Sequence, residues 1–216
     1  IRGLAALLDC RAAAQVKFDA YRPDGTGPCL FFAPGVEGHA HVARRLLPFL
    51  PHDLRVYGLR GPEPVASESW SLAEIAAFCV VHLRAVQPTG PYNLAGYSLA
   101  GAVAHAIAIQ LEAAGEAVHL SIIDTDLHLD RVKFPQPYLG TQVFPRYENA
   151  TSRHLAEPIQ GRVLLVRAWE RPERRLLMPG LGWEHIACNG VDLLDIPGSP
   201  QLCLAFVELL GSRSIA

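Results

Sequence analysis

The residue of this sequence best suited to covalent chemistry is Ser98, in the run Gly-Tyr-Ser-Leu-Ala. The apolar residues Tyr92–Ala95 predict a strand before it, and an apolar-rich stretch from Leu99 predicts a helix directly after it. A serine on such a sharp turn holds its hydroxyl exposed above the sheet. The turn also brings together the residues two before and two after the serine, and Gly96 and Ala100 are both small. The spacing predicts a nucleophile at Ser98, with alanine in place of the usual second glycine.

Two backbone N–H groups are candidates to stabilise the oxyanion that forms when a serine attacks a carbonyl. The N–H of Leu99 lies at the predicted helix N-terminus, where the helix dipole favours negative charge. The second is expected in the loop after an earlier strand, Cys29–Ala33. Gly35 and Gly38 allow that loop to fold back, which leaves the N–H of Val36 as the predicted donor. The alternative is an ordinary turn of glycine and proline.

A carboxylate is expected at the end of a strand that follows the nucleophile, in the chain order serine, aspartate, histidine. Asp124 directly follows the apolar run Val118–Ile123, at the point where the chain is expected to leave the sheet. Asp126 is the alternative, and either residue could instead cap the next segment as a turn residue. Asp124 is preferred because it is the first residue after the buried run.

The elements that must position these residues alternate along the chain. Ser71 and Glu74 form a capping-box pair that predicts the start of a helix, and a second helix is expected at 99–114, ending near Gly115. Further strands are expected at Leu54–Gly58, Val163–Val166 and Val191–Ile196, and a closing helix at Leu202–Leu210. Strands that alternate with helices predict an α/β fold, with a mostly parallel sheet covered by helices on both faces.

The 216 residues, half of them hydrophobic, suit one domain, which we place at 27–216. Residues 1–26 are expected to form a linker or N-terminal extension. Residues 127–158 carry several prolines and little periodicity, so they are expected to form a lid region.

Composition excludes several classes of function. The 19 basic and 21 acidic residues give a net charge of −2, which does not predict nucleic-acid binding. No apolar run is long enough to span a membrane. The 5 cysteines are scattered, without the paired spacing of a zinc site, so we expect buried free thiols in a reducing cytoplasm. No metal or organic cofactor is implied.

The sequence resembles the thioesterase domains of polyketide synthases, nonribosomal peptide synthetases and animal fatty acid synthase, which have the α/β-hydrolase fold. The resemblance covers roughly residues 27–210. It is carried by the segments 33–38, 56–59, 86–92, 96–101, 122–125 and 161–166, of which Gln-Pro-Thr-Gly-Pro-Tyr before the serine is especially characteristic. It implies that Ser98 accepts an acyl chain from the phosphopantetheine thioester of an acyl or peptidyl carrier protein. Water, or a nucleophile within the chain, would then release the product by hydrolysis or cyclisation.

The family's catalytic histidine is missing from its expected place, shortly after the last strand. Here Ile196 is followed by Pro-Gly-Ser-Pro200, with no histidine after it. One explanation is a true deletion, which would leave the domain inactive or much weakened. A second is substitution by another histidine: His185, His105, His39 or His41. The third, which we favour, is that the natural protein has a histidine-bearing loop between Ser199 and Pro200, because Pro200 resembles the residue that opens the family's last helix.

Three functions follow from this reading. The first is a chain-releasing serine thioesterase of a multidomain synthase. The second is a stand-alone editing (type II) thioesterase that clears stalled carriers. The third is a non-catalytic carrier-binding domain that has lost its histidine. The sequence leaves open the acyl chain, the choice between hydrolysis and cyclisation, and the oligomeric state.

Overall fold

The computed structural model describes residues 17–35, 38–62, 70–125, 127, 157–168 and 180–196. Within these residues the strands are β1 (Phe18–Arg22), β2 (Cys29–Phe32), β3 (Arg55–Leu59), β4 (Tyr92–Tyr97), β5 (Val118–Ile123), β6 (Val163–Ala168) and β7 (Val191–Ile196). The helices are α2 (His41–Leu46), α3 (Leu72–Val86) and α4 (Leu99–Ala113), with short 3-10 helices η1 (Leu47–Phe49) and η4 (Trp183–His185).

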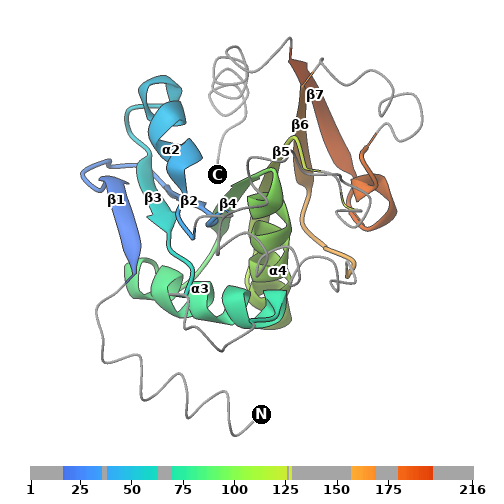
Figure 1. Ribbon diagram of the computed structural model, residues 1–216, viewed down its shortest axis with the longest axis horizontal. Helices are drawn as coiled ribbons and strands as arrows, with labels where there is room; N and C mark the ends of the chain where they lie inside the picture. The colour runs from blue at the N-terminus through green and yellow to red at the C-terminus, as the bar shows by residue number, and fades with distance from the viewer. Residues whose placement is uncertain are drawn as a thin grey trace, which may run out of the picture.

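The strands form one sheet in the order β1-β3-β2-β4-β5-β6-β7. All neighbouring pairs are parallel except β1 with β3, so the expectation of a mostly parallel sheet is confirmed. Figure 1 shows β1 and β7 at the two edges. The chain moves from β2 to β3 on one side and then returns to β4 on the other side of β2. Ligands of open parallel sheets bind where the strand order reverses in this way, at the carboxyl ends of the strands.

Helices cover both faces of the sheet, as expected. One hydrophobic cluster joins α3 and α4 to the side chains of one sheet face, including Phe31, Leu94 and Leu165. A second cluster joins α2, through Ala43 and Leu46, to the opposite face. In Figure 1, α3 and α4 lie together and α2 lies apart from them.

The predicted helix starts are confirmed, and that of α3 is capped as expected. Ser71 Oγ accepts the N–H of Glu74 at 3.2 Å, and Glu74 Oε2 accepts the N–H of Ser71 at 2.8 Å, which completes the capping box. Helix α4 begins at Leu99 and ends at Ala113, one residue earlier than predicted, before Gly115 with its φ of 83°. Two strands are longer than predicted, β4 through Tyr97 and β6 through Ala168.

The first strand, β1, was not predicted. It falls within the expected extension 1–26, yet it pairs antiparallel with β3, and Phe18 lies edge-on to Tyr57 with ring centroids 5.5 Å apart. Its five residues, Phe-Asp-Ala-Tyr-Arg, form no continuous apolar run from which a strand could be predicted. The sheet therefore begins before Gly27.

Two expectations lie outside the described residues: the closing helix at Leu202–Leu210 and almost all of the lid region 127–158. Within the described part of the chain, no helix combines the length and the apolar character needed to cross a bilayer.

Candidate active site

Ser98 occupies the turn between β4 and α4. Strand β4 ends at Tyr97 and α4 begins at Leu99, and Ser98 has φ 53° and ψ −126°. Such backbone geometry costs roughly 1–3 kcal/mol for a residue other than glycine and persists only where the surrounding structure enforces it. Here the N–H of Ser98 donates to the carbonyl of Ile123 at 2.9 Å, which fixes the turn to β5. The structure thus places Ser98 in the strained turn that its sequence context predicts.

Close packing within this turn explains the small residues around Ser98. A Cβ at Gly96 would lie 2.3 Å from the carbonyl oxygen of Ala100 and 2.6 Å from the nitrogen of Gly101. A Cβ at Gly101 would lie 2.2 Å from Oγ1 of Thr125. Glycine is therefore required at these two positions by backbone and side-chain contacts.

Asp124 lies at the end of the strand next to the one that carries Ser98. Strand β5 pairs with β4 in a register that aligns Ile123 with Tyr97, so the residues after them leave the sheet at the same edge. Asp124 is half-buried with φ 46°, and its N–H donates to the carbonyl of Val166 at 2.7 Å. The structure brings the predicted nucleophile and the predicted acid to neighbouring strand ends. The alternative acid, Asp126, lies outside the described residues.

The predicted oxyanion donors follow β2 and β4, the two strands at the point where the sheet order reverses. Leu99 is buried and is the first residue of α4, where backbone N–H groups have no acceptor within the helix. Val36 follows β2 but lies outside the described residues. A hydrogen bond joins Gly35 and Gly38, which lie before and after Val36: the N–H of Gly38 donates to the carbonyl of Gly35 at 2.9 Å.

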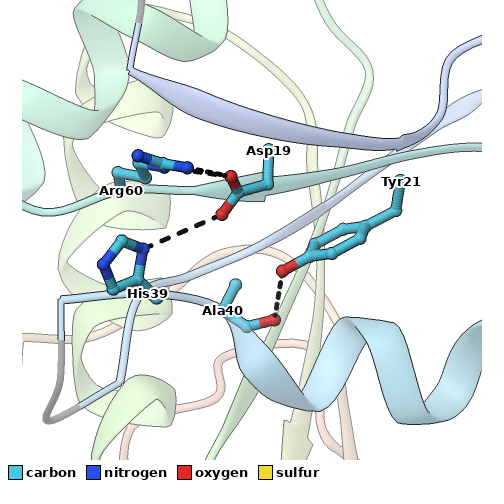
Figure 2. A network of polar contacts seen from close by, with 5 residues as sticks. All are labelled: Asp19, Tyr21, His39, Ala40 and Arg60. Atoms are coloured by element: carbon cyan, nitrogen blue, oxygen red, sulfur yellow. Dashed lines mark hydrogen bonds and ion pairs between the residues drawn. The ribbon is translucent and has the colours of Figure 1, made fainter.

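A polar network on β1 supports the end of this loop (Figure 2). Asp19 accepts Nε of Arg60 at 3.0 Å, and its other carboxylate oxygen lies 3.8 Å from Nδ1 of His39. The hydroxyl of Tyr21 donates to the carbonyl of Ala40 at 3.3 Å. Burial, followed by the negative charge of Asp19, raises the pKa of Tyr21 above its usual value, so this hydroxyl stays protonated and can donate. The edge strand thus fixes the segment that follows the predicted donor.

Part of this chain is similar to proteins of known family. Residues 28–132 match the family model of the thioesterase domain. The chain is 38% identical over 104 residues to vanchrobactin synthetase VabF of Vibrio anguillarum, covering 47% of this chain and 4% of that protein. It is 35% identical over 122 residues to a non-reducing polyketide synthase of Pseudevernia furfuracea, covering 55% of this chain and 6% of that protein. The chain therefore spans only a small part of the length of these relatives.

Solved structures share the fold. The thioesterase domain NocB from the nocardicin cluster superposes with a TM-score of 0.75 at 22% identity, over 92% of this chain and 98% of that one. A four-domain nonribosomal peptide synthetase bound to AMP and glycine gives a TM-score of 0.75 at 20% identity, over 92% of this chain and 20% of that one. By sequence and by fold, the chain resembles a synthetase thioesterase domain. Its fold is that of the α/β-hydrolases.

The four histidines weighed as the missing base of this thioesterase-like domain differ in their surroundings. His39 takes part in the Asp19 network, and its ring centroid lies 5.4 Å from that of His41. His185 is exposed in η4. His105 is fully buried in α4, with Nε2 2.9 Å from the carbonyl of Glu157 and its ring edge-on to Trp183. The surroundings of His105 are those of a core residue. The expected loop at Ser199 and Pro200 lies outside the described residues.

The described thiols differ in their exposure. Cys29 and Cys79 are buried and free, and burial raises the pKa of the Cys79 thiol to about 12. Cys188 is exposed, so the expectation of buried thiols is wrong there, because it lies in the turn before β7 rather than in the core. Cys10 and Cys203 lie outside the described residues. Among the residues that the structure describes, no cluster of three or more histidine, cysteine, aspartate or glutamate side chains could hold a metal.

Proposed function

We propose that this chain is a chain-releasing serine thioesterase domain of a polyketide or nonribosomal peptide synthase. Its substrate is an acyl chain carried as a phosphopantetheine thioester on an acyl or peptidyl carrier protein. The observation that carries the proposal is the strained turn at Ser98, with φ 53° between β4 and α4, at the reversal point of the sheet. The relatives, which are multidomain synthetases, favour chain release over an editing enzyme.

The first half-reaction transfers the acyl group to the enzyme. Ser98 Oγ attacks the thioester carbonyl carbon while a histidine base accepts its proton. The N–H groups of Leu99 and Val36 donate to the oxyanion that results. The carbonyl re-forms as the carbon–sulfur bond breaks, and the phosphopantetheine thiol leaves with the proton from the histidine. Asp124 holds that histidine in the required orientation.

The second half-reaction releases the product. Water, or a hydroxyl or amine within the acyl chain, attacks the ester carbonyl of acyl-Ser98 with the histidine again accepting its proton. Ser98 leaves with that proton, and the product is a free acid or a ring. No metal or organic cofactor is required, since the phosphopantetheine arm arrives with the carrier. We propose that this reaction takes place in the cytoplasm, where the carrier protein of the synthase would supply the acyl thioester.

The histidine is assigned to a loop between Ser199 and Pro200. Strand β7 ends at Ile196, so a loop directly after it leaves the same edge of the parallel sheet as Ser98 and Asp124. The coding sequence across this junction tests the assignment. A histidine-bearing insertion supports it, whereas uninterrupted Ser199–Pro200 in the natural gene contradicts it.

Acylation of Ser98 is the direct test of the proposed function. The chain, with the histidine-bearing loop restored where the natural gene encodes it, is incubated with an acyl N-acetylcysteamine thioester, a small analogue of the carrier arm, and its intact mass is measured. We expect one acyl adduct that maps to Ser98 and is absent from S98A. The matched control is S121A, which removes a buried serine of β5 away from the turn and should retain the adduct.

The absence of a histidine after β7 in this sequence favours a second candidate, a non-catalytic carrier-binding domain. Such a domain would bind a carrier protein but form no adduct. A folded chain that includes any histidine-bearing loop of the natural gene, yet gives no adduct and does not react with a fluorophosphonate at Ser98, would overturn the thioesterase proposal. Carrier binding by that same chain would then support the second candidate.

A further inference from the structure

Thr125, directly after the predicted acid, contacts the turn of the predicted nucleophile. Its side chain is 1% exposed, and Oγ1 lies 2.6 Å from the carbonyl oxygen of Ser98 and 3.2 Å from that of Ile123. A threonine hydroxyl has a single proton, which it donates to the nearer of the two acceptors. Thr125 therefore forms a hydrogen bond that joins the end of β5 to the end of β4.

A second buried group fixes Thr125 from its other side. The indole Nε1 of Trp183 donates to the carbonyl of Thr125 at 2.9 Å, and Trp183 is fully buried. Leu181, with φ 51°, and Gly182, with φ 90°, form the turn that leads the chain into this tryptophan. Gly101 leaves the space that the Thr125 side chain occupies, since a Cβ there would lie 2.2 Å from Oγ1. Both the hydroxyl and the carbonyl of Thr125 are thus held.

The two turns that Thr125 joins both have a residue with positive φ. Ser98 has φ 53° and Asp124 has φ 46°, a region that few non-glycine residues adopt, although aspartate does so more often than most. Ser98 is bonded to the end of β5 and to the residues just after it, because its N–H donates to the carbonyl of Ile123 and its carbonyl accepts the hydroxyl of Thr125. Loss of the Thr125 hydroxyl would leave the Ser98 carbonyl with donors from its own turn and helix, such as the N–H of Gly101 at 2.9 Å, and without its bond to the end of β5.

We infer that Thr125 is a positioning residue that fixes the separation of Ser98 and Asp124, with Trp183 supporting it. The inference rests on the proposed function for its effect on catalysis. The hydrogen bonds of Thr125 and the backbone angles that they hold do not depend on that function. Because a displacement of about 1 Å in a reacting group can cost up to about 100-fold in rate, a bond between the two turns bears directly on acylation.

The test is the labelling of Ser98 by a fluorophosphonate, followed by intact mass, in the chain with any histidine-bearing loop that the natural gene encodes between Ser199 and Pro200. The variant T125V removes the hydroxyl and keeps the branched shape, and we expect the maximal labelling rate to fall about 10-fold. The concentration for half-maximal labelling should stay within about twofold, because Thr125 is not placed to touch the reagent. The variant T125S restores the hydroxyl and should recover most of the rate.

Two further variants separate positioning from simple loss of stability. The control I75V shortens a buried side chain of α3, away from the turn, and should lower the melting temperature without changing the labelling rate. The variant W183F keeps an aromatic ring and removes the N–H, so we expect a smaller fall in rate than for T125V. Equal rates for T125V and the unmodified chain would overturn the inference.

Amide hydrogen exchange provides a readout that does not require a reactive serine. T125V should accelerate exchange in the peptide that spans residues 96–101, whereas T125S and I75V should not. If the unmodified chain is not labelled at all, the proposed function fails and the exchange data still decide the role of Thr125. Unchanged exchange in T125V would then contradict the inference.

Discussion

At the residue scale, the two small residues that flank Ser98 are not equivalent. The contacts that forbid a side chain at Gly96 are to the backbone of residue 100, its carbonyl carbon and oxygen at 2.5 and 2.3 Å. The Cβ of Ala100 is not among the three nearest atoms, and Ala100 itself is accommodated in the buried start of α4. The departure from the usual second glycine is therefore compatible with the turn, whereas a departure at the first would not be.

This difference predicts opposite outcomes for two substitutions. G96A forces a Cβ against backbone that cannot move away, so we expect a loss of more than about 2 kcal/mol in unfolding free energy and no labelling of Ser98. A100G should cost about 1 kcal/mol through helix propensity and leave labelling within about twofold. Urea denaturation and fluorophosphonate labelling measure both. Labelling of G96A at the unmodified rate would contradict the account of the turn.

His105 gives a second prediction at this scale. It lies in the core against Trp183, so H105A should lower the unfolding free energy by about 3 kcal/mol through loss of a buried ring. Loss of a triad base costs several orders of magnitude in rate. We expect the labelling rate of H105Q, corrected for its folded fraction, to stay within about threefold of the unmodified chain. A fall of about 1000-fold would instead identify His105 as the base.

At the scale of elements, the edge strand β1 supports the loop after β2. Asp19 and Tyr21 project from β1 to Arg60, His39 and Ala40, as Figure 2 shows. The N–H of Gly61 adds a bond to the carbonyl of Gly38 at 2.9 Å. The bonding residues of β1 precede Val36 in the chain and residues 60–61 follow it, and both groups hold the loop residues just after Val36. The strand that was not predicted therefore contributes to the proposed site.

A pair of variants tests this role of β1. The Asp19 ion pair with Arg60 is partly exposed, and such surface pairs contribute about 0–1 kcal/mol, so D19N should change stability little. We expect the acylation rate to fall several-fold because the loop loses a support. D192N is the control, since it removes the exposed pair with Arg162 between β6 and β7. The same fall in both variants, measured by thioester acylation, would refute a specific role for Asp19.

At the scale of the whole molecule, the strand order determines where the chemistry can occur. The reversal between β2 and β4 places the loop after β2 beside the turn after β4, and β5 follows as the next strand. Ser98, Leu99 and Asp124 therefore belong to adjacent strand ends, although they are separated from the β2 loop along the chain. The end of β7 lies at this same edge, but β6 separates it from Ser98 and Asp124. A histidine after β7 must therefore be carried past the end of β6 by a loop of several residues.

The loop itself is the subject of the last prediction. If the natural gene encodes a histidine between Ser199 and Pro200, the chain with that loop should hydrolyse the thioester analogue at least about 1000-fold faster than the chain without it. Replacement of that histidine by alanine should return the rate to the lower value. Turnover is measured by release of the thiol. Equal turnover with and without the loop would show that the base lies elsewhere.

The sequence by itself determined the local features of this protein. The apolar runs predicted six of the strands, the Ser71–Glu74 pair predicted the start of α3, and the run around Ser98 predicted its turn, because each depends on neighbours in the chain. Only the tertiary structure decided which distant segments meet. Strand β1 is stabilised by pairing with β3, despite its polar residues, and Thr125 acquires its role because Ser98 and Trp183 pack against it from other elements. Such contacts depend on the order of strands in the sheet, which periodicity and spacing do not encode.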